Sequence, residues 1–575
     1  MVSSTLIVLL VVSARGGGAH LGAARARRCA APRAAPRASE RSCTSDVVVI
    51  GAGLGGLSCA ALLAKYGYSV TVAEAHDRPG GAAHSFSRAT RAGTFTFDSG
   101  PSLFSGCSAP SLNPMRQVLD ATGASADVEW RTYDEWSMYL PEGTMKVRSG
   151  DEAALGRELG RLGGAAAAAD WRRLLAANRP LAELIGAVPP IALRADAWAV
   201  RTAGVPYLPQ TNPLAGLQTF LAGTSPSGAY SSVLRAAAVP ADGLVGRWVD
   251  FLAFALSGLP ADGTSAAAVA FMMRELFAPA AVMDYPVGGA QAVADALVGA
   301  IERRGGRVLL RARVAEVLAE GGAAVGVRLD DGAELRARVA VVSNADVWRT
   351  AALLPAALRD GRARDAAART PRTRSFVHLH VGLDASGLPP PSELGIHHIV
   401  VNSWERQIDA EDNALFVSIP SALDGSAAPA GHHAVHAYMP ATEPYSRWAR
   451  LDRRSVEYAA LKEERARPLW DALERVVPDA RARAVFSSVG SPLTHERYLN
   501  AEAGSYGPGW RAGEASFPGH RSALLANLWC VGASTFPGIG VPAVAGSAMA
   551  CANTIAPVER HLALLDEMRA AGTLR

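Results

Sequence analysis

The hydrophobic positions between residues 45 and 73 predict a strand, a helix and a second strand. Residues 47–50 are a run of Val and Ile, which suits a strand buried on both faces of a parallel sheet. Apolar residues continue a helical pattern through 60–64, and Gly67 is placed to end this helix. A second apolar run follows at 69–73. The pattern therefore predicts a βαβ unit.

The pattern changes between residues 307 and 346 to short β-rich runs separated by turn residues. The dipeptides Gly321-Gly322 and Asp331-Gly332 mark the ends of these runs. Short runs punctuated by such dipeptides are typical of antiparallel hairpins. This region is therefore predicted to be a β-meander.

A strand with two different faces is expected at "SFVHLHVG", residues 375–382. Alternation places Phe376, His378 and His380 on one face and three aliphatic side chains on the other. Two histidines on one face of a strand could bind a metal, with further histidines at 397–398 and 432–436. Acidic partner motifs are missing, so a pocket or interface is favoured and no metal is expected. A general-acid role for one histidine stays open.

An uncharged stretch near the C-terminus, "CVGASTFPGIGVPAVAGSAM" (530–549), contains four glycines and few bulky side chains. Such composition is typical of places where a large group approaches the backbone closely. Its first part predicts a strand that ends in glycine, followed by a loop. "VPAVAGSAMACANTI" predicts a helix with Pro542 in its first turn.

Together these patterns predict an α/β fold made of two interleaved parts. The nucleotide-binding part is a Rossmann-like domain with a β-meander, and the inserted α+β part is a substrate domain with an apolar interior. The expected segments of the nucleotide-binding part are 45–110, 281–346 and 501–575. The expected segments of the substrate domain are 111–280, which is rich in helical patterns, and 347–500, which contains strands.

Composition changes this picture only slightly. A chain of 575 residues is long enough for two or three cores, and 49% hydrophobic with 19% charged residues is a globular balance. The first 40 residues hold six Arg and one Glu, so the formal charge of +4 leaves the rest near neutral. A near-neutral folded part excludes nucleic acid as a partner. The six cysteines are scattered, so no disulfide framework or zinc site is suggested.

Residues 1–44 are interpreted as a targeting leader. An apolar run at 6–12 resembles a signal-peptide core, and the Ala-, Arg- and Pro-rich segment after it resembles a transit peptide. This favours import into a plastid (chloroplast) and removal of the leader. The apolar run is shorter than the ~20 residues that span a bilayer. No later stretch is long enough either, so any membrane contact is expected to be peripheral.

The chemistry-bearing motif of the βαβ unit is a glycine-rich turn followed by an acidic residue. Gly51, Gly53 and Gly56 form GxGxxG between strand and helix, with Gly55 inside the motif. Gly51 permits a tight turn, Gly53 lets a pyrophosphate meet the backbone, and Gly56 lets the helix pack on the strand. Glu74 should accept hydrogen bonds from a ribose hydroxyl. A carboxylate repels a 2′-phosphate, so NADP is disfavoured at this site.

The residues after Glu74 favour FAD over NAD as the cofactor. Arg78, Gly80 and Gly81 resemble the RxGG extension of the FAD-binding amine oxidase and phytoene desaturase superfamily. There a glycine-lined loop passes beside the flavin and its phosphates, and Arg78 would add a charged donor. An ordinary turn is the alternative interpretation.

An extended FAD must end against some other part of the chain, and the small-residue stretch fits this role. The helix that begins near Gly540 and Val541 would point its N-terminus at the N1/C2=O edge of the flavin. Its dipole would stabilise a reduced, anionic flavin. Gly532 and Ala533 precede it as further contact residues. By analogy with two-dinucleotide flavoproteins, the backbone near Val314 is expected to contact adenine.

The motifs together resemble one branch of a known family. The chain from about 46 to 555 resembles the carotenoid isomerase branch of the phytoene desaturase-like flavoproteins. The motifs that carry this resemblance include "HDRPGGAAHSFSR", "FDSGPSLFSG", "GIHHIVVNSWER" and "STFPGIGVPAVAGSAM". One departure is Ala533, which stands where the isomerases have an aspartate and where bacterial-type desaturases commonly have alanine.

The resemblance implies redox-neutral cis–trans isomerisation of a poly-cis C40 carotenoid with reduced FAD. It also implies an electron donor, which stays unidentified, and an apolar tunnel for the substrate. It places four residues on the substrate side, without assigning a catalytic residue: Asp98, Ser99, His397 and His398.

Three other functions remain open at this point. A carotenoid desaturase, or a hydratase acting on a carotenoid or xanthophyll, would use the same fold. A non-catalytic flavin- or carotenoid-binding protein is the second alternative. A small-amine oxidase is the third, although no aromatic-cage motif is visible.

Overall fold

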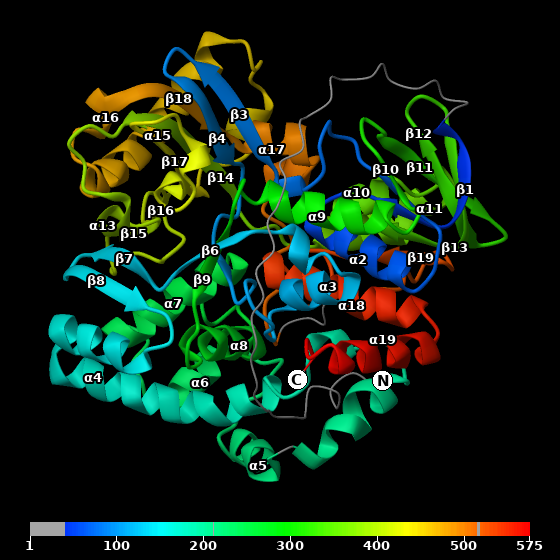
Figure 1. Ribbon diagram of the computed structural model, residues 1–575, viewed down its shortest axis with the longest axis horizontal. Coiled ribbons are helices and arrows are strands. Elements are labelled where there is room, and N and C mark those ends of the chain that lie inside the picture. Colours follow the sequence, from blue (N-terminus) through cyan, green and yellow to red (C-terminus); the bar gives the residue numbers. More distant parts are fainter. Residues whose placement is uncertain (1–40, 211, 514–517, 575) are drawn as a thin grey trace.

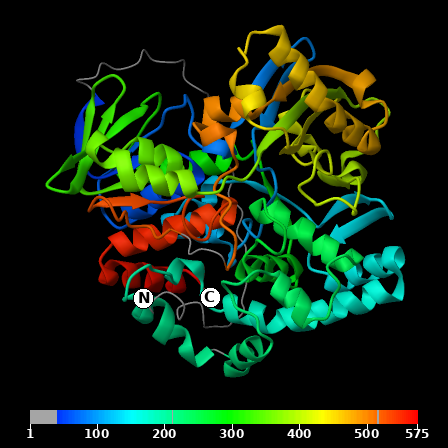
Figure 2. The same ribbon diagram turned by 180° about the vertical axis from the view of Figure 1, so that it is seen from behind.

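The computed structural model describes residues 41–210, 212–513 and 518–574. Two seven-stranded sheets organise this part of the chain, one at the upper right and one at the upper left of Figure 1, with a helical region below the second sheet. The view from behind in Figure 2 shows the same separation. The predicted leader lies almost entirely outside the described residues.

The first sheet combines parallel strands with an antiparallel meander. Its order is β10-β2-β1-β13-β12-β11, and β19 pairs in parallel with β13. The strands are β1 (Cys43–Ile50), β2 (Val70–Ala73), β10 (Arg307–Leu309), β11 (Val314–Glu320), β12 (Ala323–Leu329), β13 (Glu334–Ser343) and β19 (Leu528–Cys530). The predicted strands at 47–50 and 69–73 and the predicted meander are confirmed. The small strand β19 brings the C-terminal stretch beside β13.

Apolar cores lie on both faces of this sheet, which explains the unbroken apolar run in β1. Val47 and Val49 pack into the core on one face of the sheet, while Val48 and Ile50 pack into the core on the other. The helices of the first of these cores are α2 (Leu54–Lys65), α3 (Pro114–Thr122), α9 (Gln291–Glu302), α18 (Val541–Ile555) and α19 (Val558–Ala570). The helix predicted at the C-terminal stretch is confirmed as α18, with Pro542 in its first turn.

The second sheet has the order β18-β14-β17-β16-β15-β7-β8. Its strands are β7 (Glu135–Leu140), β8 (Gly143–Arg148), β14 (Ser375–Asp384), β15 (His397–Val401), β16 (Ala414–Ser418), β17 (His432–Ala441) and β18 (Ala484–Gly490). The aliphatic side chains of β14 pack against α15 (Val456–Val476) in an apolar core. The predicted alternation in β14 is therefore confirmed, and His378 and His380 lie on the face away from α15.

The remaining elements connect these layers. Two small sheets are formed by β3 (Ser85–Thr90) with β4 (Gly93–Asp98), and by β5 (Phe104–Ser105), β9 (Met283–Pro286) and β6 (Trp130–Tyr133). The helical region contains α4 (Glu152–Ile185), α5 (Pro213–Leu221), α6 (Ser231–Ala236), α7 (Leu244–Ser257) and α8 (Ala266–Phe277). Two short helices occur where the chain passes from one sheet to the other: α10 (Val347–Ala352) after β13 and α17 (Pro492–Leu499) after β18.

Each sheet is assembled from segments that are far apart in the sequence. The first takes strands from 43–73, 307–343 and 528–530, and the second from 135–148 and 375–490. The boundaries given above for the two predicted domains stay predictions. No helix in the described ranges combines the length and the apolar character needed to cross a bilayer.

Candidate functional site

Three glycine-rich segments meet at the carboxyl edge of β1. A Cβ atom on Gly55 would lie 2.7 Å from Asn344 Oδ1 and 3.0 Å from Gly532 Cα. A Cβ on Gly81 would lie 2.9 Å from Gly53 Cα. Contacts this short are not compatible with a side chain, so the segments can approach one another only as glycines. We call residues 51–56, 80–81 and 532 the glycine cradle.

Asn344 lies at the centre of the cradle, and sequence reasoning missed it. It directly follows β13, and its N–H donates to Ile50 O at 2.9 Å. A Cβ on Gly53 would lie 2.8 Å from its Nδ2, and one on Gly532 would lie 2.5 Å from its Oδ1. The polar residue at the end of a buried strand, in "VVSNAD", is the signal that could have pointed to it.

The N-terminus of α2 opens onto the cradle without a side chain to cap it. Gly53 is the N-cap residue, it makes no side-chain hydrogen bond, and the first turn carries no acidic residue. Uncapped N–H groups and the positive end of the helix dipole favour an anion such as a pyrophosphate. The cradle therefore has the chemistry that a dinucleotide needs.

Glu74 is held in place by backbone donors. Its Oε2 accepts from Ala52 N–H and its Oε1 accepts from His76 N–H, both at 2.7 Å. A carboxylate has about four acceptor positions, so two remain for ribose hydroxyls. The N–H of Ala312 donates to Glu74 O at 2.7 Å, which brings the start of β11, with the buried Val314, near this side of the cradle. The predicted ribose and adenine contacts are thus compatible with the geometry.

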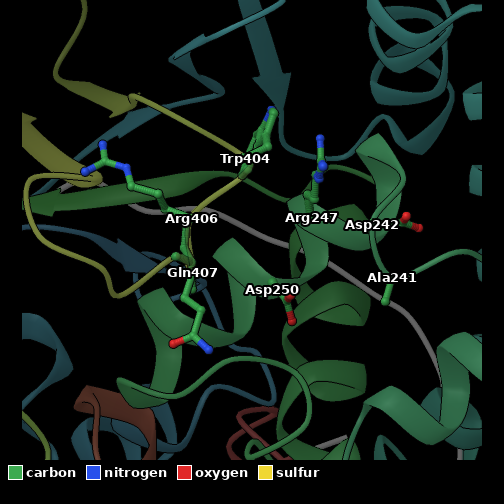
Figure 3. A pocket seen from close by; sticks show the side chains of 8 residues that line it. Ala241, Asp242, Arg247, Asp250, Trp404, Arg406 and Gln407 are labelled. Carbon is green, nitrogen blue, oxygen red and sulfur yellow. The ribbon is translucent and has the colours of Figure 1, made fainter.

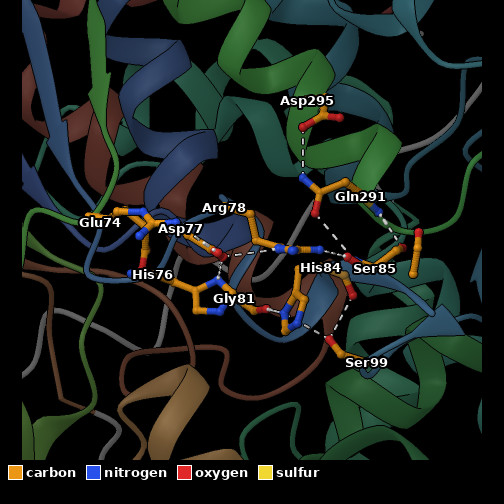
Figure 4. A network of polar contacts seen from close by, with 12 residues as sticks. Glu74, His76, Asp77, Arg78, Gly81, His84, Ser85, Ser99, Gln291 and Asp295 are labelled. Carbon is orange, nitrogen blue, oxygen red and sulfur yellow. Dashed lines mark hydrogen bonds and ion pairs between the residues drawn. The ribbon is translucent and has the colours of Figure 1, made fainter. Parts of the chain in front are cut away.

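Arg78 connects the second glycine segment to the next strand. Its Nη1 donates to Ser85 O at 2.7 Å, as Figure 4 shows, and Gly80 N–H donates to Ala52 O at 2.8 Å. The bond from Gly80 holds the loop of residues 80–81 against the segment before α2, and the bond from Arg78 ties this loop to β3. Arg78 retains further N–H donors for a phosphate.

The loop before α18 is held by the helix itself. Ser547, in the middle of α18, accepts a hydrogen bond from Gly532 N–H at 3.1 Å and contacts Thr535 Oγ1 at 2.5 Å. Gly540 is the N-cap of α18, and Ala533 and Val541 lie at the two ends of the loop. A Cβ on Gly540 would lie 3.4 Å from Leu256 O in α7. The N-terminus of α18 therefore faces the helical region below the second sheet.

A row of five aromatic side chains leads from α7 across the second sheet toward this N-terminus. We call Phe251, Phe416, Tyr438, Phe376 and Tyr506 the aromatic row. Its successive ring centroids are 6.0, 4.9, 5.8 and 5.1 Å apart. Tyr506 is followed by Gly507, where a Cβ would lie 3.0 Å from Ile539 Cδ1, so the row ends next to the loop before α18.

The four predicted substrate-side residues have different surroundings. Asp98 is 1% exposed, and its carboxylate accepts from Ala290 N–H, Ser85 and Tyr285 at 2.8 to 2.9 Å. Burial raises its pKa. Ser99 Oγ lies 3.0 Å from His84 Nδ1, a contact drawn in Figure 4. These two residues connect strands β3, β4 and β9 beside the cradle.

His397 and His398 lie on opposite faces of β15. His397 Nδ1 lies 2.7 Å from Tyr133 Oη, and its Nε2 lies 3.1 Å from Ser102 Oγ. The ring of His398 lies 6.2 Å from that of Tyr139. Burial lowers the pKa of His397 to about 3 and that of His398 to about 4, so both are neutral at pH 7. The structure brings only His397 to the face that carries the aromatic row.

Other histidines gather on that same face. The ring centroids of His378, His380 and His436 lie 4.5 to 6.0 Å apart. No group of three or more His, Cys, Asp or Glu side chains in the described ranges is arranged to hold a metal ion. We therefore consider these histidines as hydrogen-bonding groups and not as metal ligands.

A surface cavity of about 280 Å³ lies away from these residues. Its lining includes Arg247 and Asp250 of α7 together with Trp404 and Arg406, as Figure 3 shows. None of its lining residues belongs to the glycine cradle or the aromatic row, and we assign it no role.

Comparisons with known proteins agree with this geometry. Residues 54–556 match the family described as flavin containing amine oxidoreductase. A prolycopene isomerase of Arabidopsis thaliana is 29% identical over 548 residues, which cover 91% of this chain and 84% of that protein. A phytoene desaturase (neurosporene-forming) of Cereibacter sphaeroides is 29% identical, covering 89% and 95%.

Prolycopene isomerase 1 of an Oncidium hybrid cultivar is 35% identical, but over 51% of this chain. The match spans only half of the length of this curated relative. Among solved structures, an oxidoreductase from Methanosarcina mazei superposes with a TM-score of 0.56 at 19% identity, covering 88% of this chain and 99% of that one. That likeness supports the fold alone.

The predicted fold class is confirmed by the family match, the sheet order and the structural likeness. A flavin is the cofactor that the family description names, and the cradle, the uncapped α2 N-terminus and Glu74 fit it. The chain belongs to the flavin-containing amine oxidoreductases.

Proposed function

We propose that this protein is an FAD-dependent cis–trans isomerase of a poly-cis carotenoid, acting without net oxidation or reduction. The observation that carries the proposal is the continuity between the glycine cradle, the N-terminus of α18 and the aromatic row. An unperturbed C=C bond does not rotate at useful rates. A reduced flavin bound here would supply the electron density that lowers its bond order.

The chain's own residues supply binding and orientation. Rings spaced 4.9 to 6.0 Å apart in the aromatic row offer faces and edges to a conjugated polyene. The N-terminus of α18 contributes the positive end of a helix dipole, which would stabilise negative charge on a reduced flavin. Glu74 disfavours a 2′-phosphate, so FAD is proposed over NADP, and the electron donor stays unidentified.

Membrane contact is proposed through the segment of residues 198–221. Eight of its large apolar side chains are at least half exposed: Trp198, Val200, Val205, Leu208, Leu214, Leu217, Phe220 and Leu221. No Asp or Glu occurs between residues 197 and 241, whereas Arg201 and Arg235 do. An apolar segment without acidic residues of its own suits a lipid bilayer with anionic headgroups. A C40 substrate dissolves in that same phase.

The proposed location is a plastid, peripheral to its membranes. The plant relatives are named as chloroplastic proteins, and the leader proposed for residues 1–44 is consistent with import. Removal of the leader before activity is part of the proposal.

The test is an assay of the protein from about residue 45. The protein is loaded with FAD, reduced without oxygen and incubated with poly-cis lycopene in lipid, and product mass is followed with the polyene absorption spectrum. All-trans product at unchanged mass that requires reduced FAD is the expected result. Product that has gained one water indicates a hydratase. Bound flavin with no turnover of any carotenoid indicates a non-catalytic flavin- or carotenoid-binding protein.

A carotenoid desaturase is the second candidate. Ala533 favours it, because this position is an aspartate in the isomerases and commonly alanine in bacterial-type desaturases, as the resemblance implies. A desaturase would remove two hydrogens per step and would need an acceptor such as oxygen or a quinone. Product mass in the same assay separates the two.

A further inference from the structure

Three histidines form a hydrogen-bonded chain at the second sheet. Nε2 of His495, in α17, lies 2.6 Å from Nε2 of His378 in β14. Nδ1 of His378 lies 2.8 Å from Nε2 of His436 in β17. Successive ring centroids are 4.8 and 5.0 Å apart and the ring planes differ by only 22° and 18°, which fits N–H···N bonds that lie close to the ring planes.

The chain runs from a partly exposed end to a buried end. His495 is partly exposed, His378 is 5% exposed and His436 is 1% exposed. Burial and the neighbouring imidazoles hold the pKa of His378 and His436 well below the usual value, and burial lowers the pKa of His495 to about 4. A neutral imidazole carries one donor and one acceptor, which is the arrangement that can pass a proton along.

The buried end is left open. Nδ1 of His436 has no hydrogen-bond partner in the described part of the protein. A buried polar atom without a partner destabilises the fold. The ring of His436 lies 5.0 Å from that of Tyr438, a member of the aromatic row. Nδ1 of His436 therefore lies on the same face of the second sheet as the aromatic row, where the polyene site is proposed.

Other titratable groups surround the chain. His380 stacks on His436 at 4.5 Å, and its Nε2 lies 3.2 Å from the backbone oxygen of Asp98. His84 lowers the pKa of His495, and His397 lowers that of His436. Within the described ranges, the hydrogen-bonded path from His495 to His436 passes through His378.

We propose that His495, His378 and His436 form a proton relay between solvent and the aromatic row. His495 takes a proton on Nδ1 from water and releases one from Nε2 to His378. His378 releases one from Nδ1 to Nε2 of His436, and His436 releases one from Nδ1 to a carbon of the bound polyene. After the bond has rotated, that carbon returns its proton to Nδ1 of His436, and the reverse transfers restore the starting tautomers and give one proton back to water. Each ring gains and loses one proton, so no oxidant or reductant is needed. The identity of the acceptor, a carotenoid, rests on the proposed function.

The first experiment needs neither substrate nor turnover. The exchange with water of the His436 ring proton is followed by NMR in flavin-loaded protein with ¹⁵N-labelled histidine, the signal being assigned by its loss in His436→Asn. In His378→Gln, which keeps an acceptor for His495 but cannot pass a proton, this exchange should slow at least tenfold. The matched control is His433→Gln, because His433 is buried in the same strand and bonds Ser421 instead. Equal exchange in His378→Gln and the wild type would overturn the relay.

A second experiment joins the relay to turnover. His495→Ala should lose about 10²-fold in isomerisation rate, a loss typical of general acid–base groups. Imidazole in solution should restore at least tenfold, whereas 1-methylimidazole should not, because its methylated nitrogen cannot pass a proton. Equal rescue by both compounds would mean that the His495 side chain only fills space, which would contradict its role in the relay. If the wild type turns over no carotenoid, the proposed function fails, and the exchange experiment alone decides the relay.

Discussion

At the scale of single residues, the cradle depends on the absence of side chains. Gly55 and Gly532 are 477 positions apart, yet a single Cβ on Gly55 would come within 3.0 Å of the backbone of Gly532. Backbone atoms give way less readily than the ends of flexible side chains. A methyl group at position 55 therefore requires the backbone loop that contains Gly532 to move.

Gly55→Ala should weaken FAD binding at least tenfold and lower Tm. Gly299→Ala is the control, because it is also a helical glycine, but its Cβ would approach only the flexible end of Arg303 at 3.1 Å. Alanine there should leave Tm unchanged or raise it, since glycine in a helix costs roughly 0.5–1 kcal/mol. Flavin fluorescence titration and thermal melts measure both. Equal behaviour of the two variants would contradict the close approach of α2 and Gly532.

Glu74→Gln should weaken FAD binding by roughly 10- to 100-fold, which corresponds to about 1.5–3 kcal/mol for a charged hydrogen bond. The amide has one acceptor oxygen, whereas the carboxylate now serves Ala52 N–H and His76 N–H at once. Its NH₂ group would face one of these donors. Isothermal titration with FAD checks this prediction, and Glu302→Gln, at the end of α9, serves as the control. Unchanged affinity would argue against the ribose contact.

At the scale of elements, the aromatic row tests whether the second sheet binds the polyene. Phe416 lies inside the row, between Phe251 and Tyr438. Phe416→Leu should raise KM for the carotenoid about fivefold, since an aromatic pair contributes about 1 kcal/mol beyond its area. FAD affinity should not change, and Phe277→Leu in α8, outside the row, should change neither. A lower FAD affinity in Phe416→Leu would indicate a structural role instead.

Helix α5 tests the proposed membrane contact. Leu217 and Phe220 on this helix are 51% and 78% exposed. The double variant Leu217→Glu with Phe220→Glu should lower sedimentation with vesicles of anionic plastid-type lipid at least fivefold, because the apolar contact with acyl chains is lost and anionic headgroups repel the new carboxylates. Val456→Glu is the control, being 80% exposed at the start of α15. An equal loss in the control, or none in the double variant, would exclude this segment as the contact.

At the scale of the whole molecule, buried histidines couple stability to pH. Burial lowers the pKa of His84, His380 and His495 to about 4, against 6.5 for exposed histidine. These groups are neutral when folded and bind protons when unfolded between pH 6.5 and 4. The free energy of unfolding should therefore fall as pH falls through this window, by about 1.4 kcal/mol per pH unit for each such histidine.

Denaturant melts from pH 7.5 to 5 measure this dependence. His561 belongs to the same class, since burial lowers its pKa to about 4, and its Nε2 bonds Ile191 O at 2.8 Å. His561→Gln keeps a donor for Ile191 and cannot titrate, so its slope should be smaller than that of the wild type. Burial raises the pKa of Asp98, which acts in the opposite direction at the acid end. A flat profile between pH 7 and 5 would contradict neutral burial of these histidines.

The sequence by itself determined the elements and the faces they bury. The run at 47–50, the glycines after it and Glu74 specify a dinucleotide unit, because strand, turn and helix N-terminus are adjacent in the chain. The helix after Gly540 and the two-faced strand β14 were also predictable, because both depend on local periodicity.

The tertiary structure alone decided which residues meet. Asn344 reaches Gly53 and Gly532 because β13 lies between β1 and β19, an order that no local pattern contains. His378 meets His436 because β14 pairs with β17 in the register that sets His380 opposite His436. Periodicity says which face a side chain takes, whereas the partner strand and its register follow from closing long loops and packing two cores together.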